Sequence, residues 1–189
     1  MIFLGDIAVP AGIIPNIDYL PECFSQPVIA NLEGAISREG TVSTIETKLF
    51  SNENVIDFLK QLNVKVVTLA NNHITDVPDA FQFTKATLDM HHIAYCGAGA
   101  DSEEASKPAV IEIDGKQYAF LSFGWEVISC KYAGKGFAGV NPLETEWVLR
   151  CIEKTKQEYP KAPIIMMPHW DYELEQYPQP MQRIGSISN

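Results

Sequence analysis

Four apolar stretches of this 189-residue sequence each end in a side chain that can bind a metal ion. These side chains are Asp6, Glu33, Asn72 with the adjacent His73, and His169. Each stretch is typical of a short buried β-strand, and ligands of open α/β sheets bind at the carboxyl ends of the strands. Residues that are distant in the sequence would therefore meet at one edge of a sheet. We predict a metal site at this edge, to which any of these side chains could contribute.

The chemical types of these side chains indicate which metal the site would bind. Two carboxylates, an amide oxygen and imidazole nitrogens suit Mn²⁺, Fe or Zn²⁺ better than Ca²⁺, which prefers oxygen ligands alone, or soft Cu(I). Each position also has a plainer explanation. Asp after Gly is common in turns, Asn31 and the Asn71-Asn72 pair suit turns as well, and a histidine at a strand end often makes structural hydrogen bonds. The coincidence of four strand ends favours the metal site.

Strands that alternate with helices must position these residues. Short apolar runs indicate the strands, and apolar residues at helical spacing beside capping residues indicate the helices. Asp114-Gly115 predicts a β-hairpin, residues 46–51 suit a strand or extended segment, and residues 124–141 suit a loop. The expected strands span residues 2–4, 27–33, 64–69, 93–96, 108–113, 117–123 and 162–167, and the expected helices span 52–62, 78–90 and 142–158. This order predicts one α/β domain over residues 1–189, with a mostly parallel sheet and flanking helices.

The composition argues against several classes of partner. With 24 acidic and 14 basic side chains the formal net charge is −10, which disfavours binding to nucleic acid or to anionic lipid. An anionic substrate remains compatible with this charge, because bound cations can reverse the local sign. The first residues do not form a signal peptide, and no apolar run approaches the roughly 18 residues that a membrane helix needs. The chain as given is expected to be cytoplasmic, without membrane insertion, and an association with the cell envelope stays open.

Cysteine usage gives no sign of a disulfide framework or a thiolate metal site. Cys23, Cys96, Cys130 and Cys151 form no CxxC pair, and none of them stands beside a histidine. We interpret them as small buried thiols of a protein in a reducing compartment.

Several motifs together resemble a known family. In chain order they are Gly5-Asp6, Ala30-Asn-Leu-Glu33, Leu69-Ala-Asn-Asn-His-Ile-Thr-Asp76, Gly97-Ala-Gly99, Glu104-Ala105 with Pro108, and His169-Trp170. This series is similar to the CapA-like, poly-γ-glutamate biosynthesis family of bacterial capsule-synthesis proteins, a branch of the calcineurin-like metallophosphoesterases. The Ala-Asn-Asn-His-x-x-Asp block is the most specific element of the resemblance, which spans nearly the whole chain.

The resemblance implies a layered sandwich of sheets flanked by helices, with two divalent metal ions at the strand ends. By this resemblance Asp6, Glu33, Asn72 and His169 match metal-ligand positions of the family, and His73 matches its second-sphere or catalytic histidine. We predict His73 as a catalytic residue, and Asn31, Asn71 and Trp170 as residues that bind the substrate. The implied reaction is metal-assisted hydrolysis of an anionic or polymer-linked phosphate ester in capsule metabolism.

Two departures from the family pattern qualify this expectation. Asp171 stands where the family usually has Gly, and the sequence ends before a Gly-His-His-Pro-His block whose histidines complete the metal centre of the family. We therefore expect a truncated copy with an incomplete second layer, whose uncovered sheet edge would favour homo-oligomers. The alternative function is a non-catalytic assembly or scaffolding component of capsule export, or a degenerate fragment.

Overall fold

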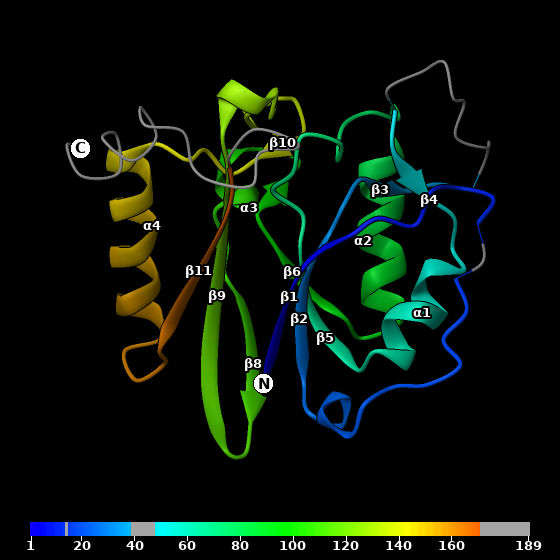
Figure 1. The fold of residues 1–189 in the computed structure, drawn as a ribbon. Helices are drawn as coiled ribbons and strands as arrows, with labels where there is room; N and C mark the ends of the chain where they lie inside the picture. Colours follow the sequence, from blue (N-terminus) through cyan, green and yellow to red (C-terminus); the bar gives the residue numbers. More distant parts are fainter. Residues whose placement is uncertain (14, 39–47, 171–189) are drawn as a thin grey trace, which may run out of the picture.

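Two β-sheets lie face to face in the centre of the structure, with helices on their outer sides (Figure 1). The computed structural model describes residues 1–13, 15–38 and 48–170. The first sheet consists of four parallel strands in the order β1 (Ile2–Ile7), β2 (Val28–Leu32), β5 (Val64–Thr68) and β6 (Ala94–Cys96). In the second sheet, β9 (Lys116–Gly124) lies between the parallel β11 (Ile164–His169) and the antiparallel β8 (Ala109–Ile113).

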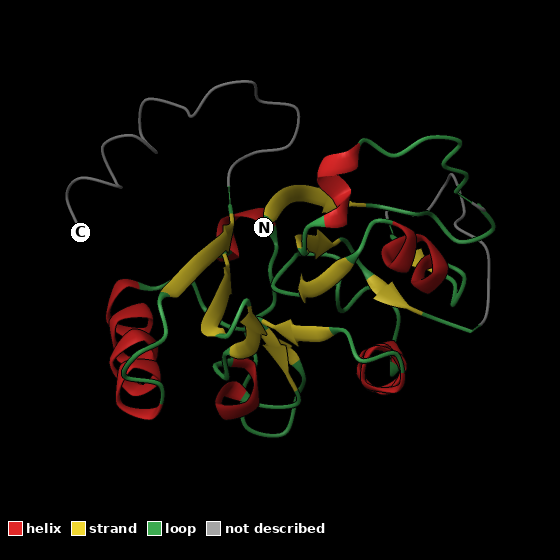
Figure 2. Ribbon diagram, turned by 90° about the horizontal axis from the view of Figure 1, so that it is seen from below, coloured by secondary structure: helices red, strands yellow, loops and turns green. Residues whose placement is uncertain are grey.

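The longer helices cover the outer faces of the two sheets. α1 (Val55–Gln61) and α2 (Ala80–Met90) pack on the first sheet, and α4 (Thr145–Glu158) packs on the second. Figure 2 shows the same arrangement from below, with strands in the interior and these helices outside. The remaining elements are short, namely β3 (Ala35–Ile36), β4 (Phe50–Ser51), β7 (Ala98–Gly99), α3 (Ser102–Ala105), β10 (Gly139–Val140) and the 3₁₀ helices Glu22–Ser25 and Glu126–Ile128. The structure confirms the predicted α/β architecture and is consistent with a metallophosphoesterase-like sandwich.

The alternation of side chains along β2 separates two hydrophobic cores. Val28, Ala30 and Leu32 belong to the core beneath α1 and α2, whereas Ile29 belongs to the core between the two sheets. All four side chains are completely buried. Because successive side chains of a strand point to opposite faces, Asn31 shares the inter-sheet face with Ile29. The carboxyl end of this strand therefore directs polar side chains into the seam between the sheets.

The same alternation applies to β11 in the second sheet. Ile165 and Met167 pack into the inter-sheet core together with Phe120 of β9. His169 lies two residues beyond Met167 and ends the strand, so the period of two places it on the same face. Figure 1 shows β1 and β11 running towards the same end of the molecule. Polar residues at the ends of both sheets thus meet in one place.

A register shift in β1 decides the direction of Asp6. Phe3 pairs with Ile29 and Asp6 pairs with Asn31, so three steps along β1 correspond to two steps along β2. One extra residue is therefore accommodated as a bulge between Phe3 and Asp6. Without it, Asp6 would share a face with Leu4, which packs against the core beneath the helices. Bulges of this kind re-aim side chains next to functional sites, and here the bulge brings Asp6 beside Asn31.

One local prediction is confirmed and others differ from the structure. The hairpin at Asp114-Gly115 is present as predicted, with both residues at positive φ as a tight turn requires. Of the expected 46–51 strand only β4 is formed, while residues 46 and 47 lie outside the described residues. The expected 124–141 loop contains β10 and a 3₁₀ turn. α1 begins at Val55 rather than directly after Asn52, and the Asn52 side chain accepts a hydrogen bond from the backbone N–H of Gly12 (2.7 Å).

Burial and helix length settle two further expectations. Cys96, Cys130 and Cys151 are buried as expected, but Cys23 is exposed in the first 3₁₀ helix, and all four thiols are free. Among the helices of the described residues, none combines the length and the apolar character needed to cross a membrane. The second sheet has three strands in this part of the chain.

Candidate metal centre

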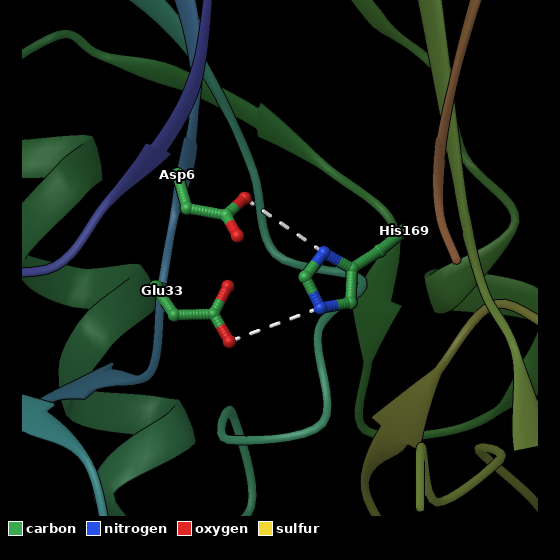
Figure 3. Close-up of side chains that lie close together, drawn as sticks. All are labelled: Asp6, Glu33 and His169. Atoms are coloured by element: carbon green, nitrogen blue, oxygen red, sulfur yellow. Dashed lines mark ion pairs between the residues drawn. The ribbon is translucent and has the colours of Figure 1, made fainter. Parts of the chain in front are cut away.

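Asp6, Glu33 and His169 converge at the carboxyl ends of β1, β2 and β11 (Figure 3). One ligand atom from each residue lies within 4.8 Å of the others. The imidazole presents one nitrogen to each carboxylate: Nδ1 lies 3.9 Å from Asp6 Oδ1, and Nε2 lies 3.8 Å from Glu33 Oε1. Asn72 joins this group, because its side-chain oxygen is 3.1 Å from His169 Nε2. The structure therefore brings the four predicted ligands together, and their binding of a metal stays a prediction.

The backbone around Glu33 explains why this side chain reaches the seam. Glu33 follows β2 directly and has the same period-2 spacing from Asn31 that Asn31 has from Ile29. Gly34 comes next with φ +82°, and a Cβ at this position would collide with the carbonyl oxygen of Leu49. Glycine is therefore required for the turn that leaves Glu33 at the strand end.

The three clustered side chains differ in their exposure to solvent. Glu33 is 8 % exposed and His169 is 17 % exposed, whereas 53 % of the Asp6 side chain is accessible. Two carboxylates this close repel each other, and the repulsion is strongest where water is excluded. A divalent cation would relieve it, since the cation would be the largest charge in the site. The electrostatics of the cluster favour cation binding.

Two distances at His169 Nε2 fit a shared cation, whereas Asp6 Oδ1 lies 3.9 Å from the other ring nitrogen, Nδ1. Ligand atoms that lie about 2.1 Å from one ion are separated from each other by about 3–4 Å, depending on the angle between them. The separations of His169 Nε2 from Asn72 Oδ1 and from Glu33 Oε1, 3.1 and 3.8 Å, fall in this interval. Among the described residues this donor set suffices for one cation. The second ion implied by the resemblance would need further ligands.

His73 lies outside this cluster and has a carboxylate partner of its own. Its Nδ1 is 2.6 Å from Asp76 Oδ2, and both side chains are 20 % exposed. The same oxygen of Asp76 accepts a hydrogen bond from the backbone N–H of Leu49 (2.9 Å), which fixes the carboxylate. Asp76 had no predicted role, although its spacing of three residues from His73 is a usable signal in the sequence. The pair holds the imidazole in a defined orientation.

The predicted substrate-binding residues have different environments. Asn31 is 6 % exposed and Asn71 is completely buried, and the amide groups of both are hydrogen-bonded within the protein. This placement favours a positioning role for both residues over the substrate contact expected from the sequence. Trp170 follows β11 and is 45 % exposed, so its ring is accessible beside His169.

A surface cavity adjoins the loop that carries His73. Its volume is about 380 Å³, and the residues that line it include Ile74, which follows His73. Thr75 and Gln82 contribute polar groups to it, and Phe137 contributes a ring that is 59 % exposed. The cavity offers space for part of a substrate close to the predicted catalytic histidine.

Comparison with known proteins gives a consistent relationship. Residues 18–185 match the family described as bacterial capsule synthesis protein PGA_cap. The capsule biosynthesis protein CapA of Bacillus anthracis is 27 % identical over 179 residues, which cover 89 % of this chain and 41 % of that protein. The PGA biosynthesis protein CapA of Bacillus subtilis (strain 168) is 28 % identical over 151 residues, covering 73 % and 36 % respectively. The chain thus spans about two fifths of the length of these curated relatives. Because the family match extends over most of its residues, the chain belongs to the bacterial capsule synthesis protein PGA_cap family.

Proposed function

We propose that this chain is a metal-dependent, phosphoesterase-like hydrolase that acts in the biosynthesis of a capsule or of poly-γ-glutamate. The observation that carries the proposal is the convergence of Asp6, Glu33 and His169 from three strands at the seam between the sheets. The names of the two relatives, a capsule biosynthesis protein and a PGA biosynthesis protein, support the biological context.

Four residues would hold the cation in this proposal. Asp6, Glu33 and His169 supply two carboxylates and an imidazole, and Asn72 adds an amide oxygen. This mixture of oxygen and nitrogen donors suits Mn²⁺, Fe or Zn²⁺. A bound cation of this type lowers the pKa of a water molecule and polarises a phosphoryl oxygen. Glu33, the most buried of the charged ligands, keeps its carboxylate within the seam, where few waters compete with the cation.

His73 would exchange a proton with the leaving group. Asp76 accepts a hydrogen bond from Nδ1 of the ring and so leaves Nε2 as the nitrogen that faces other groups. An imidazole held in this way can act as a general acid or base at neutral pH. The exposed ring of Trp170 and the cavity beside Ile74 would contact the remainder of an anionic or polymer-linked substrate.

The experiment combines metal content with turnover. The purified protein is analysed for bound metal and then assayed with bis(p-nitrophenyl) phosphate in the presence of Mn²⁺, Zn²⁺ or Fe²⁺. We expect hydrolysis in the presence of at least one of these ions, and its loss in His169→Ala. His91→Ala is the matched control, because His91 pairs with Lys60 at the surface, away from the cluster.

Two results would speak against this proposal. A protein that binds none of the three metals and hydrolyses nothing would exclude it. Capsule formation in cells that is unchanged by Asp6→Asn and by His169→Ala would favour the alternative, a non-catalytic assembly or scaffolding component of capsule export.

A further inference from the structure

We infer that Asn31 is a positioning residue, which holds the carboxylates of Asp6 and Glu33 in the arrangement that binds the cation. Its side-chain nitrogen donates one hydrogen bond to Asp6 Oδ1 (2.8 Å) and another to Glu33 Oε2 (2.5 Å). An amide nitrogen carries two hydrogens, so both are used on the two acidic ligands. The inference rests on the proposed function, because it assigns Asn31 a task in the same metal site.

The strand register places Asn31 of β2 beside the carboxylates of both Asp6 and Glu33. Asn31 is the register partner of Asp6 on β1 and of Thr68 on β5, so the three residues form one row across the sheet. Glu33 lies two residues further along, on the same face as Asn31. A donor at this position can therefore reach Asp6 sideways and Glu33 along the strand.

The orientation of the Asn31 amide follows from groups whose hydrogen-bonding roles cannot be exchanged. The Asn71 nitrogen donates to the backbone carbonyl of Leu32 (2.8 Å), and its oxygen accepts from the backbone N–H groups of Gly34 (3.1 Å) and His73 (3.2 Å). These backbone partners fix which end of the Asn71 amide is nitrogen. That nitrogen also donates to the side-chain oxygen of Asn31 (3.2 Å).

Thr68 completes the assignment of the Asn31 amide. Its hydroxyl donates to the same oxygen of Asn31 at 3.1 Å, so this oxygen receives two hydrogen bonds. The nitrogen of Asn31 must then face the two carboxylates, as the distances show. Asn31 is only 6 % exposed and Thr68 is 3 % exposed, which keeps water from replacing these bonds. The orientation is thus built into the core and does not depend on a bound ligand.

A neutral donor is the side chain that this position requires. A carboxylate at position 31 would add a third negative charge beside Asp6 and Glu33, and a lysine would neutralise the charge that attracts the cation. The amide instead restrains one oxygen of each ligand and leaves the negative charge of both in place. Partners that orient metal ligands in this way typically change metal affinity by about 10–100-fold when they are removed.

The test measures the Mn²⁺ affinity of variants by calorimetric titration of the metal-free full chain, together with their melting temperatures. We expect Asn31→Ala to weaken Mn²⁺ binding by about 10–100-fold. Thr68→Val removes only one of the bonds that orient Asn31, and we expect it to weaken binding by a smaller factor in the same direction. Asn141→Ala is the control, because Asn141 is also completely buried and bonds to Ser122 and Trp147, outside this row. It should lower the melting temperature and leave the Mn²⁺ affinity unchanged.

The outcomes separate this inference from the proposed function. Wild-type protein that binds Mn²⁺ and an Asn31→Ala variant with equal affinity would overturn the positioning role and leave the metal site intact. If Asn31→Ala does not fold, Thr68→Val with the wild-type affinity has the same meaning. If Asn141→Ala loses Mn²⁺ affinity as strongly as Asn31→Ala, the loss comes from general destabilisation, and the positioning role of Asn31 is overturned. Wild-type protein that binds none of Mn²⁺, Zn²⁺ and Fe²⁺ would overturn both the inference and the proposed function.

Discussion

Replacing Asp6 by Asn should stabilise the metal-free protein and, at the same time, remove most of the stabilisation that Mn²⁺ provides. Oxygen atoms of Asp6 and Glu33 lie within 4.8 Å of each other. Two unit charges at this separation repel by about 3 kcal/mol at an effective dielectric constant of about 20. Because 53 % of the Asp6 side chain is exposed, solvent screens most of this repulsion, and we expect a gain of about 1 kcal/mol. The introduced amide oxygen can still accept the hydrogen bond from Asn31.

Thermal and urea unfolding at pH 8, with EDTA or with Mn²⁺, measure both effects. For a chain of this size a gain of about 1 kcal/mol raises the melting temperature by about 2–4 °C. Mn²⁺ at about 100 times its dissociation constant should stabilise the wild type by about 2.7 kcal/mol. Asp6→Asn lacks one charged ligand, so its stability should respond much less to the same Mn²⁺ concentration.

Asp57→Asn is the control for the loss of one negative charge. Asp57 is exposed in the first turn of α1, which packs on the outer face of the first sheet and not in the seam, so its replacement should leave the response to Mn²⁺ as in the wild type. An Asp6→Asn variant that is less stable than the wild type in EDTA and gains as much stability from Mn²⁺ would contradict a role of Asp6 in cation binding. Asp6 would then be a structural residue whose carboxylate meets no cation.

Three further predictions concern catalysis, packing and thiol reactivity. His73→Ala should lower kcat for bis(p-nitrophenyl) phosphate by about 10²–10⁴-fold with unchanged Mn²⁺ affinity, and a loss of affinity instead would make His73 a ligand. Ile29→Ala should lower the free energy of unfolding, measured in urea, by about 2–5 kcal/mol, because Ile29 is completely buried between the sheets. A decrease below about 1 kcal/mol would mean that the sheets are loosely packed. Burial raises the pKa of Cys96 and Cys130 to about 12, and the charge of Glu33 adds to the effect on Cys130. At pH 8 only about 10⁻⁴ of either thiol is ionised, so Ellman's reagent should modify the exposed Cys23 rapidly and these two thiols only after unfolding. Fast labelling of Cys130 in the folded protein would show that the core around it opens.

The sequence pattern was sufficient for the architecture and for the strand ends at which the four candidate ligands stand, but not for the bulge that turns Asp6 towards the seam. Apolar runs with polar endings identify strands, and parallel strands with connecting helices place these endings at one edge of a sheet. Glu33 and His169 follow this logic directly, since each terminates a strand whose inward face continues the alternation of the core.

The interactions between strands could not be read from the pattern. The role of Asn31 depends on its lateral neighbours Asp6 and Thr68, and the residues that face one another across strands are set by register, which composition does not reveal. The partnership of His73 and Asp76 depends on a loop, whose conformation has no periodic signal. Asn52 was expected to begin a helix, and its side chain instead bonds to Gly12, forty positions earlier in the chain.

The extra residue in β1 shifts the strand's register against β2. Only because of this shift does the acid of the Gly-Asp pair point towards the seam. A homologue with the same spacing, but with regular pairing between β1 and β2, would keep every letter of the Gly5-Asp6 motif while its acid pointed towards the helices. Such a protein would pass a motif search as a metal-binding relative and fail as one. The pairing of β1 with β2, rather than the Gly-Asp pair itself, therefore decides whether the acid can take part in the proposed metal site.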